Sequence, residues 1–166
     1  MTVYTQATNL VASGIQYSLT GGDSLLVYQG VTLGSTTSNV ITVAGAATTA
    51  FIAGTLFGAG ANGTASVADS TLTITATGAV TGNESLGNGA VLVNTGGTVV
   101  NDGSITSSGG YGILMFGLGS TATNAGTITG GTGRFAGATG SFTAERLLNS
   151  VTGVTSGSFK GTIVTH

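Results

Sequence analysis

The side chains that could carry out acid–base, nucleophilic or metal chemistry are few in this chain of 166 residues. It contains no cysteine, and its one histidine, His166, is the final residue, where we expect no second side chain to orient it. Cys–His and Ser–His–Asp arrangements and zinc sites each need a cysteine or a well-placed histidine. We therefore predict no catalytic residues, no metal site and no cofactor, and we expect that the protein is not an enzyme.

The acidic residues are spread too widely to act as a pair or a cluster. Glycoside hydrolysis needs two carboxyl groups within roughly 10 Å of each other, and a calcium site needs several oxygen ligands. Asp23, Asp69, Glu84 and Asp102 stand at four different offsets from a glycine that recurs about every 24 residues. No two of them would stack in one column of such a repeat, so we interpret them as solvated surface acids.

Two Gly-x-Gly strings have the composition of phosphate-binding loops but not their context. Gly58-Ala59-Gly60 and Gly131-Thr132-Gly133 are followed neither by a Lys-Ser/Thr pair nor by the helix that such a loop needs to hold a phosphate. We therefore interpret both strings as corners or turns.

The charges are few and unevenly placed. Only 5% of the residues are charged and the net charge is −2, whereas a phosphate backbone is bound by clusters of Lys and Arg. The three basic residues, Arg134, Arg146 and Lys160, all lie near the C-terminus. Residues 1–133 hold four acids and no base, which gives −4, and residues 134–166 hold three bases and one acid, which gives +2. We expect no nucleic-acid partner.

The composition is typical of an exported protein that does not span a membrane. Mean hydropathy is +0.45, but Gly, Ser, Thr and Asn interrupt every apolar run well before the ~20 residues of a spanning helix. Few charges, no cysteine and abundant Gly, Thr, Ser, Asn and Ala favour an extracellular or bacterial cell-surface location. Residues 1–6 lack the basic and apolar regions of a secretory signal. This leaves open a processed form, export without such a signal, or a cytosolic or phage protein.

A glycine recurs through most of the chain at intervals of 24, 24, 25 and 23 residues, and each copy opens a short β-prone segment. The five glycines are Gly30, Gly54, Gly78, Gly103 and Gly126. A period in this range, without strong helix signals, is typical of a β-solenoid in which each repeat forms one coil. We predict an all-β solenoid of about five to six coils. Residues 1–29 lack the glycine but alternate over residues 15–19, so we expect them to form a degenerate first coil.

Alignment of the copies on the glycine predicts the interior. Side chains of a strand alternate between faces, so two apolar columns an even number of residues apart should both point inward. These columns stand four residues before the glycine (Leu26, Ala50, Ile74, Val99 and Ala122) and two after it (Thr32, Leu56, Val80, Ile105 and Ile128). Apolar runs at residues 39–43, 90–93 and 113–116 predict a second strand in each coil, and residues 58–70 predict an open corner. We expect the glycine itself to adopt a positive φ.

The neighbouring columns should face outward, and they are rich in threonine, which suits an exposed strand face. They stand five residues before the glycine (Leu25, Thr49, Thr73, Thr98 and Thr121) and three after it (Leu33, Phe57, Thr81, Thr106 and Thr129). Stacked hydroxyls about 4.8 Å apart would form a flat, charge-free array suited to ice or glycans, although threonine is also the usual exposed residue of a β-helix. The candidates for such a binding face are Thr73, Thr75, Thr98, Thr106, Thr121, Thr123 and Thr129.

Two of the repeats carry a resemblance to a known group of proteins. Asn101-Asp102-Gly103-Ser104-Ile105 and Asn124-Ala125-Gly126-Thr127-Ile128 resemble the N-x-G-x-I rungs of right-handed parallel β-helices, as in autotransporter passengers and filamentous adhesins, with a pectate-lyase-like solenoid. The resemblance covers residues 70–130 well and residues 23–70 loosely. Asn101 and Asn124 share a column of the alignment, so we expect their amides to bond from rung to rung.

The last residues depart from the repeat. We predict that residues 1–129 form the solenoid body and residues 130–166 a small β-rich cap over its last coil. The predicted cap has a hairpin turning at residues 137–140, a short helix over residues 144–148, and a second hairpin whose strands, residues 151–155 and 158–164, turn at Ser156-Gly157. An open solenoid end exposes strand edges and apolar side chains, which must be covered or used for assembly.

These features favour a structural function over a catalytic one. We expect a secreted or cell-surface protein whose copies associate end to end into filaments, or an adhesin-like fibre subunit. The candidate assembly residues are the tail bases Arg134, Arg146 and Lys160 and the acid Asp23, because tail and body carry opposite charge. The alternative is a module that binds ice or surface glycans through the threonine face. A carbohydrate-active enzyme or a phage tailspike fragment is disfavoured, since either would need clustered acids.

Overall fold

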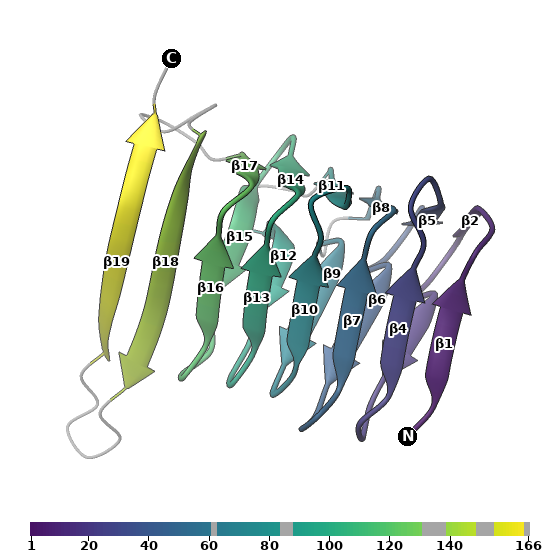
Figure 1. The fold of residues 1–166 in the computed structure, drawn as a ribbon, viewed down its shortest axis with the longest axis horizontal. Coiled ribbons are helices and arrows are strands. Elements are labelled where there is room, and N and C mark those ends of the chain that lie inside the picture. Colours follow the sequence, from purple (N-terminus) through teal and green to yellow (C-terminus); the bar gives the residue numbers. More distant parts are fainter. Residues whose placement is uncertain (61–62, 84–87, 131–138, 149–154, 165–166) are drawn as a thin grey trace.

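The computed structural model describes residues 1–60, 63–83, 88–130, 139–148 and 155–164. These residues form strands joined by turns and contain no helix. The strands make three sheets that run along the long axis of the molecule, with β1 at one end and β19 at the other (Figure 1). The predicted all-β solenoid is confirmed.

Each of the first five coils contributes one strand to each sheet. The first sheet has eight strands: β1 (Val3–Gln6), β4 (Ser24–Val27), β7 (Thr49–Ile52), β10 (Thr71–Ile74), β13 (Thr98–Asn101), β16 (Thr121–Asn124), β18 (Thr139–Leu148) and β19 (Thr155–Val164). The second sheet has six: β2 (Leu10–Ala12), β5 (Thr32–Ser35), β8 (Thr55–Gly58), β11 (Ala79–Gly82), β14 (Ser104–Ser107) and β17 (Thr127–Thr129). The third sheet has five: β3 (Tyr17–Leu19), β6 (Ile41–Ala44), β9 (Ala65–Ala68), β12 (Gly89–Val93) and β15 (Tyr111–Met115).

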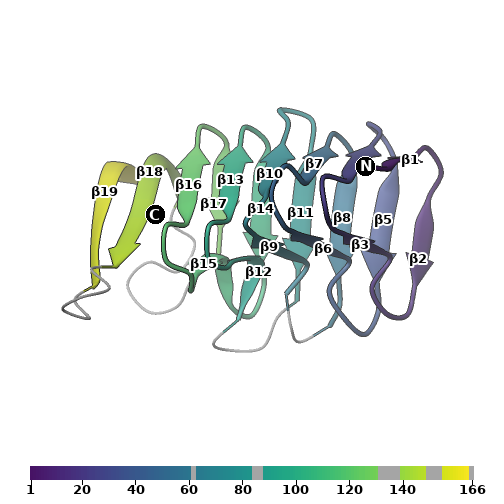
Figure 2. The same ribbon diagram turned by 90° about the horizontal axis from the view of Figure 1, so that it is seen from below.

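Consecutive coils pair in parallel and in register. Val80 lies between Leu56 and Ile105, and Ile105 lies beside Ile128, so residues about two dozen apart stack directly. Five coils are complete, and β16 and β17 begin a sixth. Figure 2 shows the strands of the second sheet lying side by side along the same axis. β1, β2 and β3 pair with β4, β5 and β6, so residues 1–29 do include the expected first coil.

Each coil has three strands, one more than the sequence predicted. The residues before and after the repeat glycine belong to different sheets, since β7 ends at Ile52 and β8 begins at Thr55. Both apolar columns still face the interior, because each strand alternates independently. Residues 58–70, predicted to be an open corner, contain β9, in which Ala65 and Val67 are fully buried. That prediction is wrong because pairing with β6 and β12 outweighs the weak strand preference of small residues.

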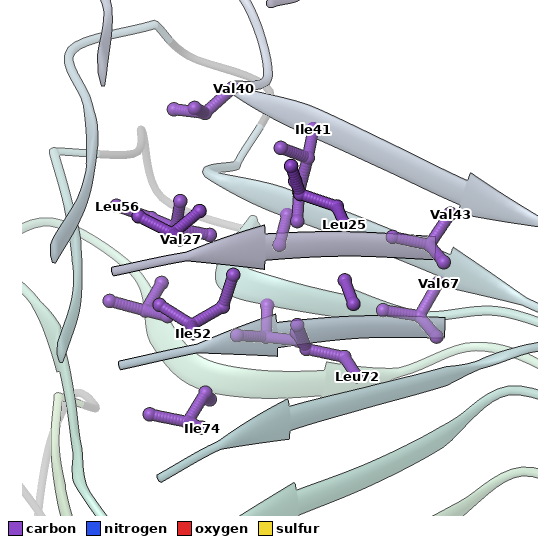
Figure 3. Close-up of a cluster of buried hydrophobic side chains, with 14 of the residues drawn as sticks. Leu25, Val27, Val40, Ile41, Val43, Ile52, Leu56, Val67, Leu72 and Ile74 are labelled. Carbon is purple, nitrogen blue, oxygen red and sulfur yellow. The ribbon is translucent and has the colours of Figure 1, made fainter. Parts of the chain in front are cut away.

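The interior is filled by aliphatic columns from all three sheets. In Figure 3, side chains of the first sheet point toward those of the other two. Its labelled residues are Leu25, Val27, Val40, Ile41, Val43, Ile52, Leu56, Val67, Leu72 and Ile74, all of which are fully buried. Removing one such side chain from water contributes roughly 1.5–3 kcal/mol. The stack therefore provides a continuous core.

The corner between the first and second sheets varies in length. In most coils a single residue, such as Ala53, separates the last inward residue of the first sheet from the position of the repeat glycine. In two coils the separation is three residues, namely residues 28–30 and 75–77. Gly30 lies inside the first of these longer corners, and Val31 takes the position that Gly54 holds in the next coil.

These longer corners displace three members of the predicted inward columns and three of the outward columns. The inward predictions for Leu26 and Thr32 and the outward predictions for Leu25 and Leu33 are wrong, whereas Ile74 does face inward and Thr73 does face outward. In the inward columns Leu25 replaces Leu26, Leu72 replaces Ile74 and Leu33 replaces Thr32; in the outward columns Ser24 replaces Leu25, Thr71 replaces Thr73 and Gly34 replaces Leu33. Ile74 also faces inward, but two residues further along its strand. An alignment anchored on one glycine cannot detect a corner that has gained residues.

The repeat glycines are required by close backbone contact rather than by the positive φ that we predicted. Only Gly30 among them has a positive φ, of 76°. At the other four, a Cβ atom would overlap a carbonyl oxygen of the preceding coil. For Gly103 these oxygens belong to Gly78 and Thr75, and for Gly126 to Gly103. Glycine therefore stacks on glycine along this corner.

The C-terminal segment forms one long hairpin in place of the predicted helix and second hairpin. β18 pairs antiparallel with both β16 and β19. Residues 144–148 belong to β18, because five residues are too few for a stable helix and the edge of β16 offers unpaired backbone groups. The predicted turn at Ser156-Gly157 lies inside β19. Of the predicted turn at residues 137–140, Thr139 and Gly140 are in β18 and the other two residues lie outside the described residues.

One inward column of the first sheet changes from aliphatic to amide side chains toward the C-terminal end. It runs through Val27, Ile52, Ile74, Asn101 and Asn124. Asn101 Nδ2 donates a hydrogen bond of 2.6 Å to Asn124 Oδ1, and both side chains are buried, which confirms the predicted bond between rungs. Asn101 Oδ1 accepts no hydrogen bond within the described part of the chain. Ile74 occupies the position from which the next amide would donate.

We expect the same substitution to have different effects at two repeat glycines. Gly103→Asn places a Cβ against carbonyl oxygens that cannot move without breaking the corner, so its cost should reach the upper end of the roughly 1–3 kcal/mol of overpacking. Gly30→Asn meets open space at a positive φ that asparagine tolerates, and should cost about 1 kcal/mol or less. Urea denaturation of both variants measures the difference, and equal losses would refute the backbone-contact explanation.

The unsatisfied amide oxygen gives a second prediction. Ile74→Asn and Ile52→Asn each replace a fully buried isoleucine of the same column, but only residue 74 lies beside Asn101. Both variants should be less stable than the wild type. The free energy of unfolding should fall by about 1–3 kcal/mol less in Ile74→Asn than in Ile52→Asn. This difference is the usual cost of leaving a buried polar group unsatisfied. Similar losses in thermal and urea unfolding would mean that Asn101 Oδ1 is not available to a new donor.

Candidate functional site

The first sheet carries one unbroken outward column of hydroxyl groups. It contains Ser24, Thr49, Thr71, Thr98 and Thr121, each directly beside the next in the parallel register. All five side chains are half-buried. Ser24 Oγ and Thr49 Oγ1 are 3.0 Å apart and share a hydrogen bond. With strands about 4.8 Å apart, this column is a regular line of hydroxyls along the body.

The seven predicted threonines do not assemble on one face. Thr98 and Thr121 are neighbours in the unbroken column. Thr106 and Thr129 are neighbours on the second sheet, which faces another direction. Thr75 lies in a corner, where its hydroxyl donates to the Ile52 carbonyl over 3.3 Å, so it is not part of a flat array.

The two remaining candidates stand in a column that apolar side chains interrupt. Thr73 and Thr123 lie on either side of Val100, and Phe51 is beside Thr73. Phe51 is exposed. The sequence reasoning missed Thr71, although alternation about the buried Leu72 identifies Thr71 and Thr73 as the outward pair of β10.

The N-terminal end of the solenoid has three strand edges and an exposed apolar surface. β1, β2 and β3 are the terminal strands of the three sheets. Val3, Leu10, Val11 and Ile15 are exposed on this coil, at 64%, 39%, 51% and 48% of their surface. Leu10 pairs with the fully buried Leu33, so a further coil on this side would bury it as well.

The interior of the first coil is closed by polar and aromatic residues that the sequence reasoning missed. Tyr4 and Tyr17 pack edge to face with ring centroids 5.5 Å apart. The Tyr17 hydroxyl donates a 2.7 Å hydrogen bond to Gln6 Oε1, and Gln6 Nε2 donates to the Thr8 carbonyl. Tyr4 and Gln6 occupy inward positions that Leu25 and Val27 hold in the next coil. That contrast was the sequence signal, but residues 1–29 were not aligned.

The C-terminal end differs because, among the described residues, strands are added to the first sheet only. The second and third sheets end at β17 and β15, whereas β18 and β19 extend the first sheet. β19 is therefore the last strand of the eight-stranded sheet, at the opposite end from β1 (Figure 1). In β19, Ser158 and Lys160 are exposed.

The candidate assembly residues occupy opposite ends of the first sheet where the structure describes them. Lys160 lies on β19, and Arg146 lies on β18 opposite Gly157. Asp23 precedes β4, one strand from the β1 edge. Arg134 lies outside the described residues.

Asp23 links the start of the chain to the turn between β3 and β4. Its Oδ1 accepts a 2.7 Å hydrogen bond from the Thr2 backbone N–H, and its Oδ2 accepts one of 3.4 Å from Thr20 N–H. The Thr2 N–H is the main cause that lowers the pKa of Asp23 below its ordinary value of 3.8, although partial burial opposes the shift. Ionised Asp23 therefore stabilises this turn and the start of β1.

The described acids do not converge. Asp23 and Asp69 both lie at the corner between the third and first sheets, but two coils apart, and Asp102 lies in the corner between β13 and β14 of another coil. Within the described ranges, no three His, Cys, Asp or Glu side chains come together as a metal site would require. In the same part of the chain, no helix is long and apolar enough to cross a membrane.

Comparison of the chain with protein-family profiles, with curated proteins and with solved structures found no significant match. The assignment of the fold as a parallel solenoid therefore depends on the strand pairings described above.

The hydrogen bonds of Asp23 predict a pH-dependent contribution to stability. Because its pKa is lower in the folded chain, the contribution is present above the ordinary pKa of 3.8 and is lost as the pH falls through the lowered value. Asp23→Asn, which keeps the shape but not the charge, should therefore be less stable than the wild type at pH 6. The difference should shrink toward zero in acid. Thermal unfolding of both proteins from pH 6 to pH 2 checks this, and a constant difference would contradict it.

Proposed function

We propose that this protein is a secreted or cell-surface structural protein whose copies associate end to end into filaments or adhesin-like fibres, without enzymatic activity. The observation that carries the proposal is the pair of open ends. β1, β2 and β3 leave three strand edges at one end, and β19 leaves a ten-residue edge at the other. Open edges pair with other chains unless they are blocked. A contact between two different ends repeats without closing and so yields a filament.

Exposed apolar side chains support association at the N-terminal end. Val3, Leu10, Val11 and Ile15 gather on the first coil. Most of the core positions of later coils are aliphatic and fully buried between neighbours. A second copy stacked on this end would give the first coil the neighbour that it lacks.

Charge also favours head-to-tail over head-to-head contact. Asp23 is the only charged side chain in residues 1–68, and residues 134–166 carry a net charge of +2. The side chains of residues 1–133 carry a net charge of −4, so two bodies repel each other weakly, whereas a body and a tail attract. This electrostatic attraction is small and is screened by salt. It selects the orientation of the contact more than it provides affinity.

The wide separation of the three described aspartates supports a structural rather than catalytic function. Asp23, Asp69 and Asp102 stand on separate coils, and glycoside hydrolysis needs two neighbouring carboxyl groups. The alternative of an ice- or glycan-binding face has less support, because the candidate threonines divide between two sheets and only one of their columns is unbroken.

We expect concentration-dependent assembly that depends on the first coil. Leu10→Asp puts a charge at the open end, and Phe57→Asp puts one at a similarly exposed apolar position in the middle of the body. Sedimentation velocity and negative-stain microscopy should show filaments for the wild type and for Phe57→Asp, and a strong shift toward monomer for Leu10→Asp. Circular dichroism establishes that each variant is folded. A wild type that stays monomeric at millimolar concentration would refute the proposal.

A further inference from the structure

The hairpin at the C-terminal end restores the direction of the first sheet. β18 is antiparallel to β16, and β19 is antiparallel to β18, so β19 runs in the same direction as β16. β16 is connected to β1 by parallel pairings alone. β19 and β1, the two edges of the first sheet, are therefore parallel strands (Figure 1). A second copy displaced along the long axis without rotation presents its β1 to β19 in the orientation that joins the coils of the body.

The continuous register defines which residues would face each other. One outward column begins at Val3 and passes through the hydroxyl column and β18 to Ser158. The next outward column begins at Thr5 and ends at Lys160. If the pattern continues across the joint, Val3 of one copy lies beside Ser158 of another, and Thr5 beside Lys160.

Of the features that usually prevent strands from pairing, the two edges carry a single one, the lysine of β19. β1 and β19 contain no proline. β1 has no charged residue, and the only one in β19 is Lys160. A lysine on an edge strand opposes pairing with another chain, so the position of this one matters. Lys160 belongs to an outward column and would stand beside Thr5, an exposed residue, so its ammonium group stays in water.

We infer that β19 of one copy receives β1 of the next as a parallel strand, in the register Val3 beside Ser158 and Thr5 beside Lys160, so that the first sheet continues through the filament. This inference rests on the proposed function and specifies its contact. The partner is a second copy of this chain, because its β1 matches β19 in direction and the side chains of its body are opposite in net charge to the tail of the first copy. The backbone pairing of the joint is made by the first sheet, since only this sheet extends through β18 and β19.

Disulfide trapping tests the contact. Because the chain contains no cysteine, disulfides can form only between the introduced residues. Single-cysteine variants are mixed in pairs under assembly conditions and oxidised, so that every disulfide between the two variants is intermolecular. The matched pairs are Thr5→Cys with Lys160→Cys and Val3→Cys with Ser158→Cys. The control is the crossed pair Val3→Cys with Lys160→Cys, two residues out of register. Its Cα atoms would be about 8 Å apart from the strand rise and spacing, beyond the ~7 Å limit for a disulfide.

We expect both matched pairs to give covalent heterodimers severalfold more abundantly than the crossed pair, as measured on non-reducing gels. Preferential linking of the crossed pair would overturn the register. Filaments in sedimentation and microscopy without linking of any pair would overturn the β19–β1 contact but leave the proposed function standing. A protein that neither assembles nor links would refute the inference and the proposed function together.

Discussion

The stacking of one coil's backbone directly on the next is the constraint on which the structure depends. It is tightest at the corner between the first and second sheets, where the Cα of Gly103 lies so close to the carbonyl oxygens of Gly78 and Thr75 that no Cβ fits. Because that contact fixes the spacing of the coils at the corner, the strands on either side can form parallel ladders. The aliphatic columns then meet inside. Loss of the close contact would separate the rungs of two sheets at once.

The same stacking explains how polar groups are accommodated inside the body. Ser70 and Ser120 are buried at the corner between the third and first sheets. The Ser70 hydroxyl donates a 2.7 Å hydrogen bond to the Val43 carbonyl in β6 of the preceding coil, and the Ser120 hydroxyl donates one of 2.7 Å to the Gly117 carbonyl of its own corner. The Asn101–Asn124 hydrogen bond likewise depends on stacking, since each amide has another amide beside it in the neighbouring coil. A polar residue is tolerated in the interior of a solenoid where its neighbour along the axis can bond to it.

The repeat architecture was predictable from the sequence because it depends on a local pattern repeated many times. The spacing of Gly54, Gly78, Gly103 and Gly126 gave the coil length, and the stacking of Ile105 on Ile128 followed from it. Single columns were less predictable. A corner that gains residues leaves no mark in local composition, so the members contributed by the second and fourth coils were displaced by one or two residues.

The tail and the candidate site were harder to predict, since both depend on contacts between distant residues. Residues 144–148 have a local preference for helix, yet Ala144 and Glu145 pair with the edge of β16 and all five residues pair with β19. The threonines were recognised by type, but their division between two sheets depends on where each corner turns. The tyrosine and glutamine residues of the first coil could be recognised only by comparison with the next coil, and residues 1–29 lack the repeat glycine that would align them.

The unequal corners have a consequence for how this chain could change in evolution. Each sheet holds its own alignment with the coils before and after it, so a corner can gain residues at positions 28–30 or 75–77 without displacing either neighbouring strand. Tyr28 and Gln29 in one such corner, and Ala76 and Thr77 in the other, are exposed. Foreign peptides inserted there would be displayed at regular intervals along a rigid body, and a longer body could be made by copying whole coils without redesigning the existing ones.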